Sequence, residues 1–139
     1  MKTTDTKNYT EEDAKIAILS VKNKFGLDMA QTVEKMLRLE TNHFKSGQFK
    51  RTGSAGMETG KWSNINPNEI EKNVYQAHDS NKSDGIDNFI IWKSPTFAAL
   101  YLADYIKRHG GNYARWYSLN TTSQQEYRNK INQIKSKFV

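Results

Sequence analysis

Apolar residues recur at three- and four-residue spacings in the first third of the chain, which is the period of an amphipathic helix. One such run follows Thr10, whose hydroxyl can cap a helix and which precedes acidic residues suited to a helix N-terminus, and Gly26 ends it. The next run predicts a helix with Asp28 as its N-cap, ending between Phe44 and Ser46. We therefore expect two consecutive helices separated by a glycine.

Two more helices are expected in the last third of the sequence. The Ser-Pro pair at 94–95 is a typical helix start, and the glycines at 110–111 are expected to end that helix. An aromatic turn is expected at 113–117. Ser123 and the Glu three residues later match a capping box, which predicts a last helix that continues through Phe138.

The region 46–93 lacks helical periodicity and holds five of the eight glycines. Long irregular regions of this kind are often functional or contain small sheets. The β-branched and aromatic residues at 88–93 predict one strand, and a proline in the first turn favours a short helix over 67–75. The expected fold class is mostly α, with a glycine-rich loop or small β element before that strand. A single domain is expected over 10–139, after a short tail at 1–9.

The composition narrows the class of protein. With 139 residues, 36% of them hydrophobic and 12% aromatic, the chain is long enough and apolar enough for one folded domain with its own core. No apolar run approaches the roughly 20 residues that span a bilayer, so no membrane insertion is expected. The lack of cysteine excludes thiol catalysis, disulfides and iron–sulfur centres, and three scattered histidines predict no metal site and no cofactor.

The charge of the chain favours an anionic partner. Lys and Arg number 21 and Asp and Glu 15, which gives a net charge of +6. Nucleic acid, an acidic membrane face and the polymers of a bacterial wall all fit that charge. Residues 1–8 contain no apolar stretch behind their charges, so a secretory signal peptide is not expected, and action on a cell wall would need another delivery route.

Glu40 is the most informative position in the chain. It lies three residues after Leu37 and four before Phe44, inside the apolar stripe of the second expected helix. Burial in that stripe would raise the pKa of the carboxyl, as a general acid near neutral pH requires. The alternative is a structural carboxylate at the edge of the stripe, paired with a base such as Arg38 or Lys45.

The residues after Glu40 form a longer motif. The segment 40–49, ETNHFKSGQF, leads into 52–57, TGSAGM. This stretch resembles the active-site segment of the lysozyme-like peptidoglycan-cleaving enzymes, especially their glucosaminidase and lytic transglycosylase branches. In those enzymes a Glu at the end of a helix is followed by an aromatic and a small polar residue, and then by a Ser/Gly-rich turn.

The resemblance extends to later parts of the chain. The segment 89–97, FIIWKSPTF, is similar to the strand-then-helix part of glucosaminidases. The segment 113–117, YARWY, together with Tyr127 and Lys130, is similar to their C-terminal part. The similar pieces occur in the same order over residues 12–138.

The resemblance implies a lysozyme-like helical domain in which Glu40 protonates the glycosidic oxygen of a peptidoglycan strand. Glycoside hydrolysis usually needs a second carboxylate. Glu58 in the glycine-rich turn is the candidate, and an ordinary solvated loop acid is the alternative. If no carboxylate faces Glu40, the lytic transglycosylase route remains, in which one Glu acts as acid and then as base while the 6-hydroxyl of the sugar attacks.

Several side chains are candidates for binding the glycan. They are His43, Ser46, Ser54, Trp62, Tyr113 and Trp116. His43 lies one helical turn after Glu40, with a satisfied structural histidine as the alternative. Trp62 has no apolar periodicity around it, which favours stacking on a sugar, whereas aromatic residues such as Trp116 are more often in the core.

The function expected from these observations is cleavage of peptidoglycan glycan strands by a muramidase, N-acetylglucosaminidase or lytic transglycosylase reaction. Delivery by a holin, a phage tail or a secretion assembly would suit it, and no nucleic-acid partner is expected. The alternative is a non-catalytic basic helical module that binds wall glycan or nucleic acid. The basic residues near the expected site favour an anionic wall polymer. They are Lys45, Lys50, Arg51 and Lys61.

Overall fold

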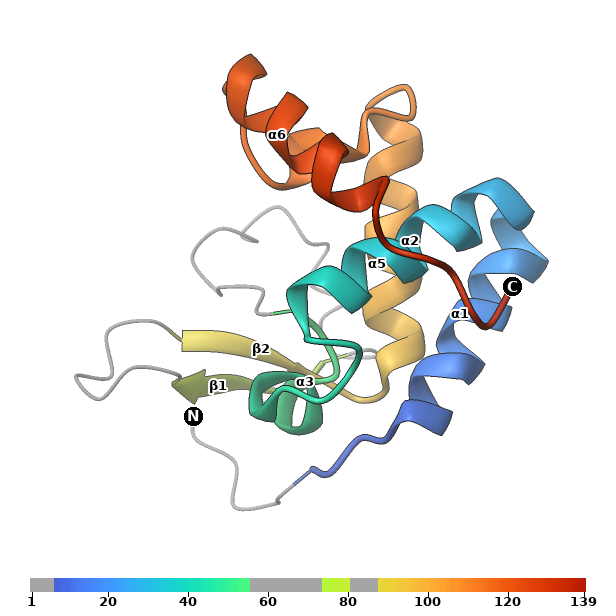
Figure 1. Ribbon diagram of the computed structural model, residues 1–139. Coiled ribbons are helices and arrows are strands. Elements are labelled where there is room, and N and C mark those ends of the chain that lie inside the picture. Colours follow the sequence, from blue (N-terminus) through green and yellow to red (C-terminus); the bar gives the residue numbers. More distant parts are fainter. Residues whose placement is uncertain (1–6, 56–73, 81–87) are drawn as a thin grey trace.

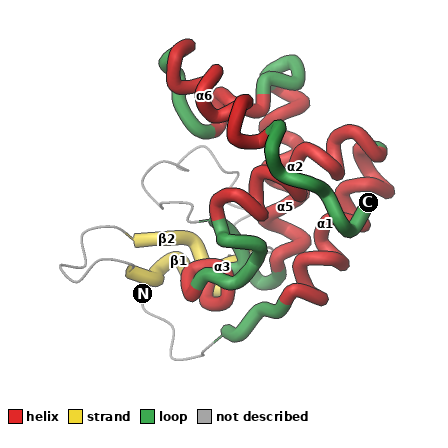
Figure 2. The backbone as a smooth tube through the Cα atoms, viewed as in Figure 1, coloured by secondary structure: helices red, strands yellow, loops and turns green. Residues whose placement is uncertain are grey.

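The computed structural model of the protein describes residues 7–55, 74–80 and 88–139, and most of these residues are helical, as expected (Figure 1). Figure 2 shows the small two-stranded sheet at one side of the group of helices, next to α3. In chain order the elements are α1 (Glu11–Phe25), α2 (Leu27–Glu40), α3 (Gly47–Thr52), β1 (Val74–Ser80), β2 (Asn88–Trp92), α5 (Pro95–Arg108), the 3-10 helix η2 (Tyr113–Trp116) and α6 (Thr121–Ile131).

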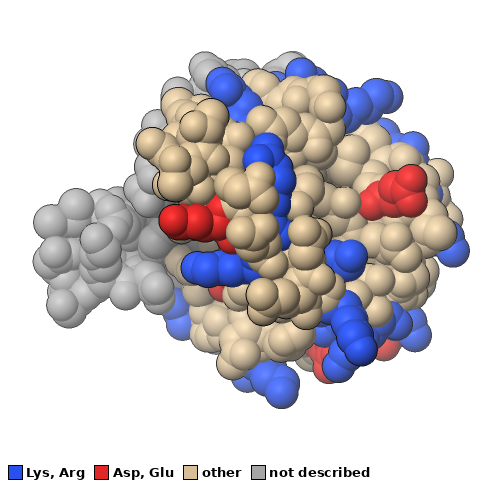
Figure 3. All heavy atoms as spheres, turned by 45° about the horizontal axis from the view of Figure 1, so that its top comes forward, with Lys and Arg blue, Asp and Glu red and all other residues tan. Residues whose placement is uncertain are grey.

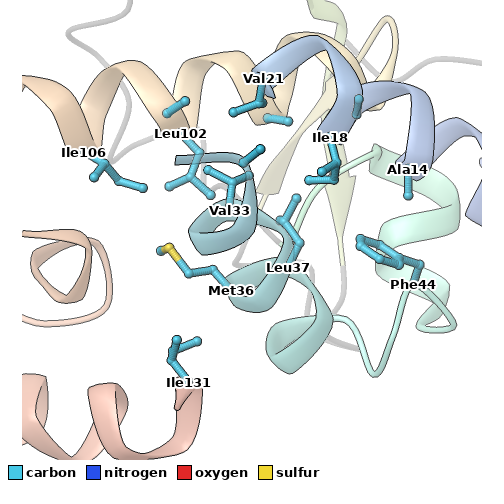
Figure 4. Close-up of a cluster of buried hydrophobic side chains, with 14 of the residues drawn as sticks. Ala14, Ile18, Val21, Val33, Met36, Leu37, Phe44, Leu102, Ile106 and Ile131 are labelled. Atoms are coloured by element: carbon cyan, nitrogen blue, oxygen red, sulfur yellow. The ribbon is translucent and has the colours of Figure 1, made fainter. Parts of the chain in front are cut away.

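Helix α2 lies at the centre of the hydrophobic core. Its apolar side chains face α1 and α5 on one side and α6 on another, and Figure 4 shows them converging on one cluster. The cluster includes Ile18 and Val21 from α1, Val33, Met36 and Leu37 from α2, Leu102 and Ile106 from α5, and Ile131 from α6. Because α2 contacts three other helices, the position of its last residue is fixed by the whole core.

The junction of α1 and α2 differs from the expectation in one detail. The N-cap expected at Thr10 is confirmed, and the structure completes it to a capping box: the Thr10 hydroxyl accepts from the N–H of Asp13, and the Asp13 carboxylate accepts from the N–H of Thr10. Gly26, at a φ of +98°, ends α1 and is also the N-cap of α2. The expectation that Asp28 caps α2 is wrong, because Gly26 already turns the chain and its carbonyl accepts the first helical bond, from Ala30.

The last helix is shorter than expected. Helix α6 begins at Thr121, and its N-cap is Asn120, whose side chain accepts from the N–H of Ser123, so the expected cap at Ser123 is wrong. The helix ends at Ile131 and does not continue through Phe138. The segment 132–139 instead runs back beside α2 (Figure 1), where its backbone finds hydrogen-bond partners.

The region between α2 and α5 contains the small sheet. The strand expected at 88–93 is confirmed as β2, which pairs antiparallel with β1. The helix expected over 67–75 is wrong at residues 74–75, which belong to β1, because strand pairing overrides local helix propensity there. The rest of that expected helix lies outside the described residues. The pattern also missed α3, which is too short to show a period and begins at the Ser46 cap.

A buried ion pair attaches segment 132–139 to α2. Glu34 and Arg38 are almost completely buried, and Nε of Arg38 donates to Oε2 of Glu34 over 2.6 Å. The same carboxylate accepts the backbone N–H groups of Lys137 at 2.7 Å and Phe138 at 3.1 Å. The Arg38 guanidinium also lies over the ring of Phe138, 4.5 Å from its centroid. Glu34 therefore neutralises a buried cation and satisfies the backbone of a distant segment.

We expect Glu34→Gln to lower the free energy of unfolding by about 3 kcal/mol, because it leaves the buried Arg38 without a counter-charge. Denaturation in urea, followed by circular dichroism, measures this loss. Asp104→Asn is the matched control, since it breaks the exposed pair of Asp104 with Arg108, at 2.8 Å, which should contribute less than about 1 kcal/mol. Equal losses in the two variants would contradict the assigned role of Glu34.

Candidate active site

The chain leaves α2 through a left-handed turn directly after Glu40. Asn42, His43 and Phe44 have φ values of 49°, 57° and 67°, which is unusual for three successive residues other than glycine. Each costs about 1 kcal/mol relative to a right-handed conformation. The expectation that the helix ends between Phe44 and Ser46 is therefore wrong. The helix ends at Glu40, which becomes the last residue of a rigid element.

Thr41 holds this turn in place. Its side chain is buried, its hydroxyl donates to the carbonyl of Leu37 at 2.5 Å, and the hydroxyl oxygen accepts from the N–H of Phe44 at 2.8 Å. The carbonyl of Thr41 accepts from the N–H groups of Lys45 and Ser46 at 3.0 and 2.9 Å. These bonds offset the cost of the left-handed backbone, and they fix the direction in which the chain leaves Glu40.

Phe44 anchors the far side of the turn. Its ring stacks on Phe138 with centroids 5.7 Å apart and meets the edge of Phe49 at 5.3 Å. The Arg38 guanidinium lies 5.0 Å from the centroid of the Phe44 ring. The turn after Glu40 is thus packed against the ion pair of α2 and against segment 132–139.

Glu40 has no cation as a partner in the described residues. Arg38, the partner that the structural alternative required, is bound to Glu34. Neither of the ion pairs formed within the described residues includes Glu40, and Lys45 is exposed. The interpretation of Glu40 as the partner of Arg38 is therefore wrong, and the carboxyl is left without the charge that would hold it ionised.

The surroundings of Glu40 raise its pKa to about 7, and burial by protein is the largest cause. The residue is nevertheless exposed at the surface, since the helix ends there and Glu40 sits at the edge of the apolar stripe. Water therefore reaches the carboxyl from one side, while protein encloses it on the others and lowers its solvation. Such a group can hold a proton near neutral pH and pass it to a ligand.

Tyr127 of α6 is the residue that interacts most with Glu40. Its interaction with the carboxyl lowers the pKa of Glu40, in opposition to the larger effect of burial. The pKa of Tyr127 itself is raised, first by burial and then by the charge of Glu40. The Tyr127 hydroxyl is buried and has no hydrogen-bond partner of standard geometry within the described residues. The two groups therefore interact at short range without a hydrogen bond of standard geometry.

Two further aromatic rings surround Tyr127. The Tyr113 ring centroid is 6.2 Å from that of Tyr127, and the Tyr117 ring stacks on Tyr127 at 4.6 Å with only 8° between the planes. Of the expected sugar-binding residues, Tyr113 therefore lies beside Tyr127, the residue that interacts with Glu40. Trp116 packs instead against α5, with its ring 5.0 Å from that of Tyr105. The sequence indicates Tyr127 in two ways, as an apolar position of the last expected helix and as part of the C-terminal resemblance, but neither predicts its contact with Glu40.

The other candidates have varied positions. Ser46 is the N-cap of α3, where its hydroxyl oxygen accepts from the N–H of Phe49. Ser54 is buried, and its hydroxyl has no partner among the described residues. His43 is half-buried in the left-handed turn, and its Nδ1 also lacks a partner there. Glu58 and Trp62 lie outside the described residues, as does Lys61.

Comparisons with known proteins add no relative. Models of protein families, curated protein sequences and solved structures were compared with the chain, and none matched. In the described part of the chain, no group of three His, Asp or Glu side chains could hold a metal ion. No helix in that part is both long and apolar enough to cross a membrane. The chemistry of this site is therefore argued from the geometry around Glu40.

The raised pKa of Glu40 predicts a pH-dependent stability. The folded state binds this proton more tightly than the unfolded state, so the stabilisation is complete below the ordinary pKa of 4.5 and is lost as the pH rises towards about 7. Glu40→Gln removes the titration. Its melting temperature should equal that of the wild type near pH 4 and exceed it near pH 8. The control is Leu27→Ala, which changes an exposed side chain that does not titrate and should therefore show a constant difference. A constant difference for Glu40→Gln as well would contradict the raised pKa.

Proposed function

We propose that the protein cleaves the glycan strands of bacterial peptidoglycan, with Glu40 as the general acid. The observation that carries this proposal is the carboxyl at the end of α2, whose pKa is raised to about 7 and which has no cationic partner in the described residues. A proton held at that pH can be given to a glycosidic oxygen, which is the step that glycoside cleavage requires. The resemblance of segments 40–49 and 52–57 to lysozyme-like enzymes points to the same residue and to a lysozyme-like arrangement of the helices.

The proposed reaction begins when Glu40 gives its proton to the oxygen between two sugars. The bond from that oxygen to the anomeric carbon breaks, and positive charge develops on the sugar. Water then attacks if a second carboxylate activates it, and Glu58 is the proposed candidate. Otherwise the 6-hydroxyl of the same sugar attacks and returns its proton to Glu40.

The charge of the surface supports an anionic polymer as substrate. Peptidoglycan strands have lactyl groups and peptide carboxylates, and the chain has a net charge of +6. Figure 3 shows Lys and Arg side chains spread over one face, with acidic side chains at fewer places. Lys45 in the turn and Lys50 in α3 are exposed and follow Glu40 closely in the chain. These side chains would attract the strand by long-range charge rather than through specific contacts.

Digestion of purified peptidoglycan tests the proposal. We expect the wild-type protein to release soluble fragments and Glu40→Gln to release them at least about 100-fold more slowly, because the proton donor is lost. The rate for the wild type should fall as the pH rises through about 7. Mass spectrometry of the fragments identifies the bond, and a product one water lighter shows attack by the internal hydroxyl.

Glu12→Gln, which changes the same functional group on the exposed side of α1, should digest at the wild-type rate. Equal rates for Glu40→Gln and the wild type would show that another residue is the acid. A folded wild-type protein that releases nothing would exclude the enzyme and favour a binding module for wall glycan or nucleic acid.

A further inference from the structure

Tyr117 places an aromatic ring in water beside the candidate active site. The residue is 53% exposed. In the described part of the chain, it is the one aromatic residue among the large hydrophobic side chains that are exposed. One face of its ring is covered by the parallel ring of Tyr127. Because more than half of the residue is open to solvent while that face is covered, the opposite face of the ring is available to a ligand.

The loop that holds Tyr117 is fixed to α6 by a polar network. The Gln124 side chain donates to the carbonyl of Ser118 at 2.8 Å. Arg128 donates to the Asn112 side chain at 2.7 Å, and Asn112 donates in turn to Gln124 at 3.3 Å. These bonds tie the two ends of the loop to one helix. The exposed ring is therefore held in position before any ligand arrives, which lowers the entropic cost of binding.

Tyr127 links the open ring to the proton donor. Its ring stacks on Tyr117, and its hydroxyl interacts with the Glu40 carboxyl. Both Glu40 and Tyr117 raise the pKa of the Tyr127 phenol, after the larger effect of burial. Tyr117 therefore stacks on the residue that interacts with the Glu40 carboxyl.

We propose that the open face of Tyr117 is a sugar-stacking subsite, which takes an N-acetylhexosamine ring of the glycan strand next to the bond that Glu40 protonates. The C–H bonds on one face of a pyranose carry partial positive charge and are attracted to the negative face of an aromatic ring. Leu119, two residues further along the loop, is 72% exposed and adds apolar surface to the same loop. This inference rests on the proposed function, because it names the part of the substrate that the site holds.

Binding of a peptidoglycan tetrasaccharide, measured by calorimetry in the Glu40→Gln background, tests the subsite. Tyr117→Ala should weaken binding about tenfold, which corresponds to about 1.4 kcal/mol, and Tyr117→Phe should recover most of it because the ring remains. The control is Leu27→Ala, which removes another exposed apolar side chain. Leu27 and Glu40 are the two ends of α2, about 20 Å apart at the rise of an α-helix, so this variant should bind normally.

Kinetics in the otherwise wild-type protein separate a subsite from a structural role. Tyr117→Ala should raise KM about tenfold while the pH at which the rate falls stays at that of the wild type. A shifted pH profile with unchanged KM would show instead that Tyr117 acts only through Tyr127. If Tyr117→Ala does not fold, Tyr117→Leu replaces it, because leucine keeps apolar bulk without a planar face.

The outcomes also distinguish the two proposals. A wild-type protein that cleaves peptidoglycan, with Tyr117→Ala unchanged in KM and in binding, would overturn the subsite and leave the proposed function intact. A wild-type protein that cleaves nothing, with no tetrasaccharide binding by Glu40→Gln, would overturn both.

Discussion

The buried pair of Glu34 and Arg38 is the interaction on which the rest of the structure depends. It satisfies a cation inside the protein, and its carboxylate receives two backbone N–H groups from segment 132–139. Removing two charges from water is costly unless they are paired and hydrogen-bonded, and α2 and the distant segment together supply the hydrogen bonds of the Glu34 carboxylate. The pair also keeps Arg38 away from Glu40. The same contact that attaches segment 132–139 therefore leaves the candidate acid without a cationic partner among the described residues.

The left-handed turn after α2 fixes the direction in which the chain leaves Glu40. Thr41 closes the helix, Phe44 enters the core against Phe138, and the residues between them accept a left-handed backbone. Strain of this kind persists only where the surroundings determine the conformation. It places Glu40 at the last turn of a helix that contacts three others. Tyr127 of α6, with aromatic rings from η2 and the following loop packed against it, then interacts with the carboxyl from a separate part of the chain.

Local signals in the sequence predicted the parts of the fold that local contacts determine. The start of α1 at Thr10, the end at Gly26 and the Ser-Pro start of α5 depend on neighbouring residues, and they are confirmed. The end of α2 and the path of segment 132–139 depend on Thr41 and on Glu34, which is 103 residues before Lys137. An apolar period continues through both segments and gives no sign of either contact. Glu40 was predicted because a carboxylate interrupts a stripe, whereas Tyr127 fits a stripe and was named only as part of the resemblance, without its contact with Glu40.

The titration of Glu40 tests the central claim most directly. The carbon-13 chemical shift of its carboxyl, followed by NMR and assigned by comparison with Glu40→Gln, reports the protonation of this one group. The account predicts a pKa of about 7 in the wild type and a higher value in Tyr127→Phe, because the Tyr127 hydroxyl lowers it. A midpoint near the ordinary value of 4.5 would show that water solvates the carboxyl fully and that Glu40 is not a proton donor at neutral pH.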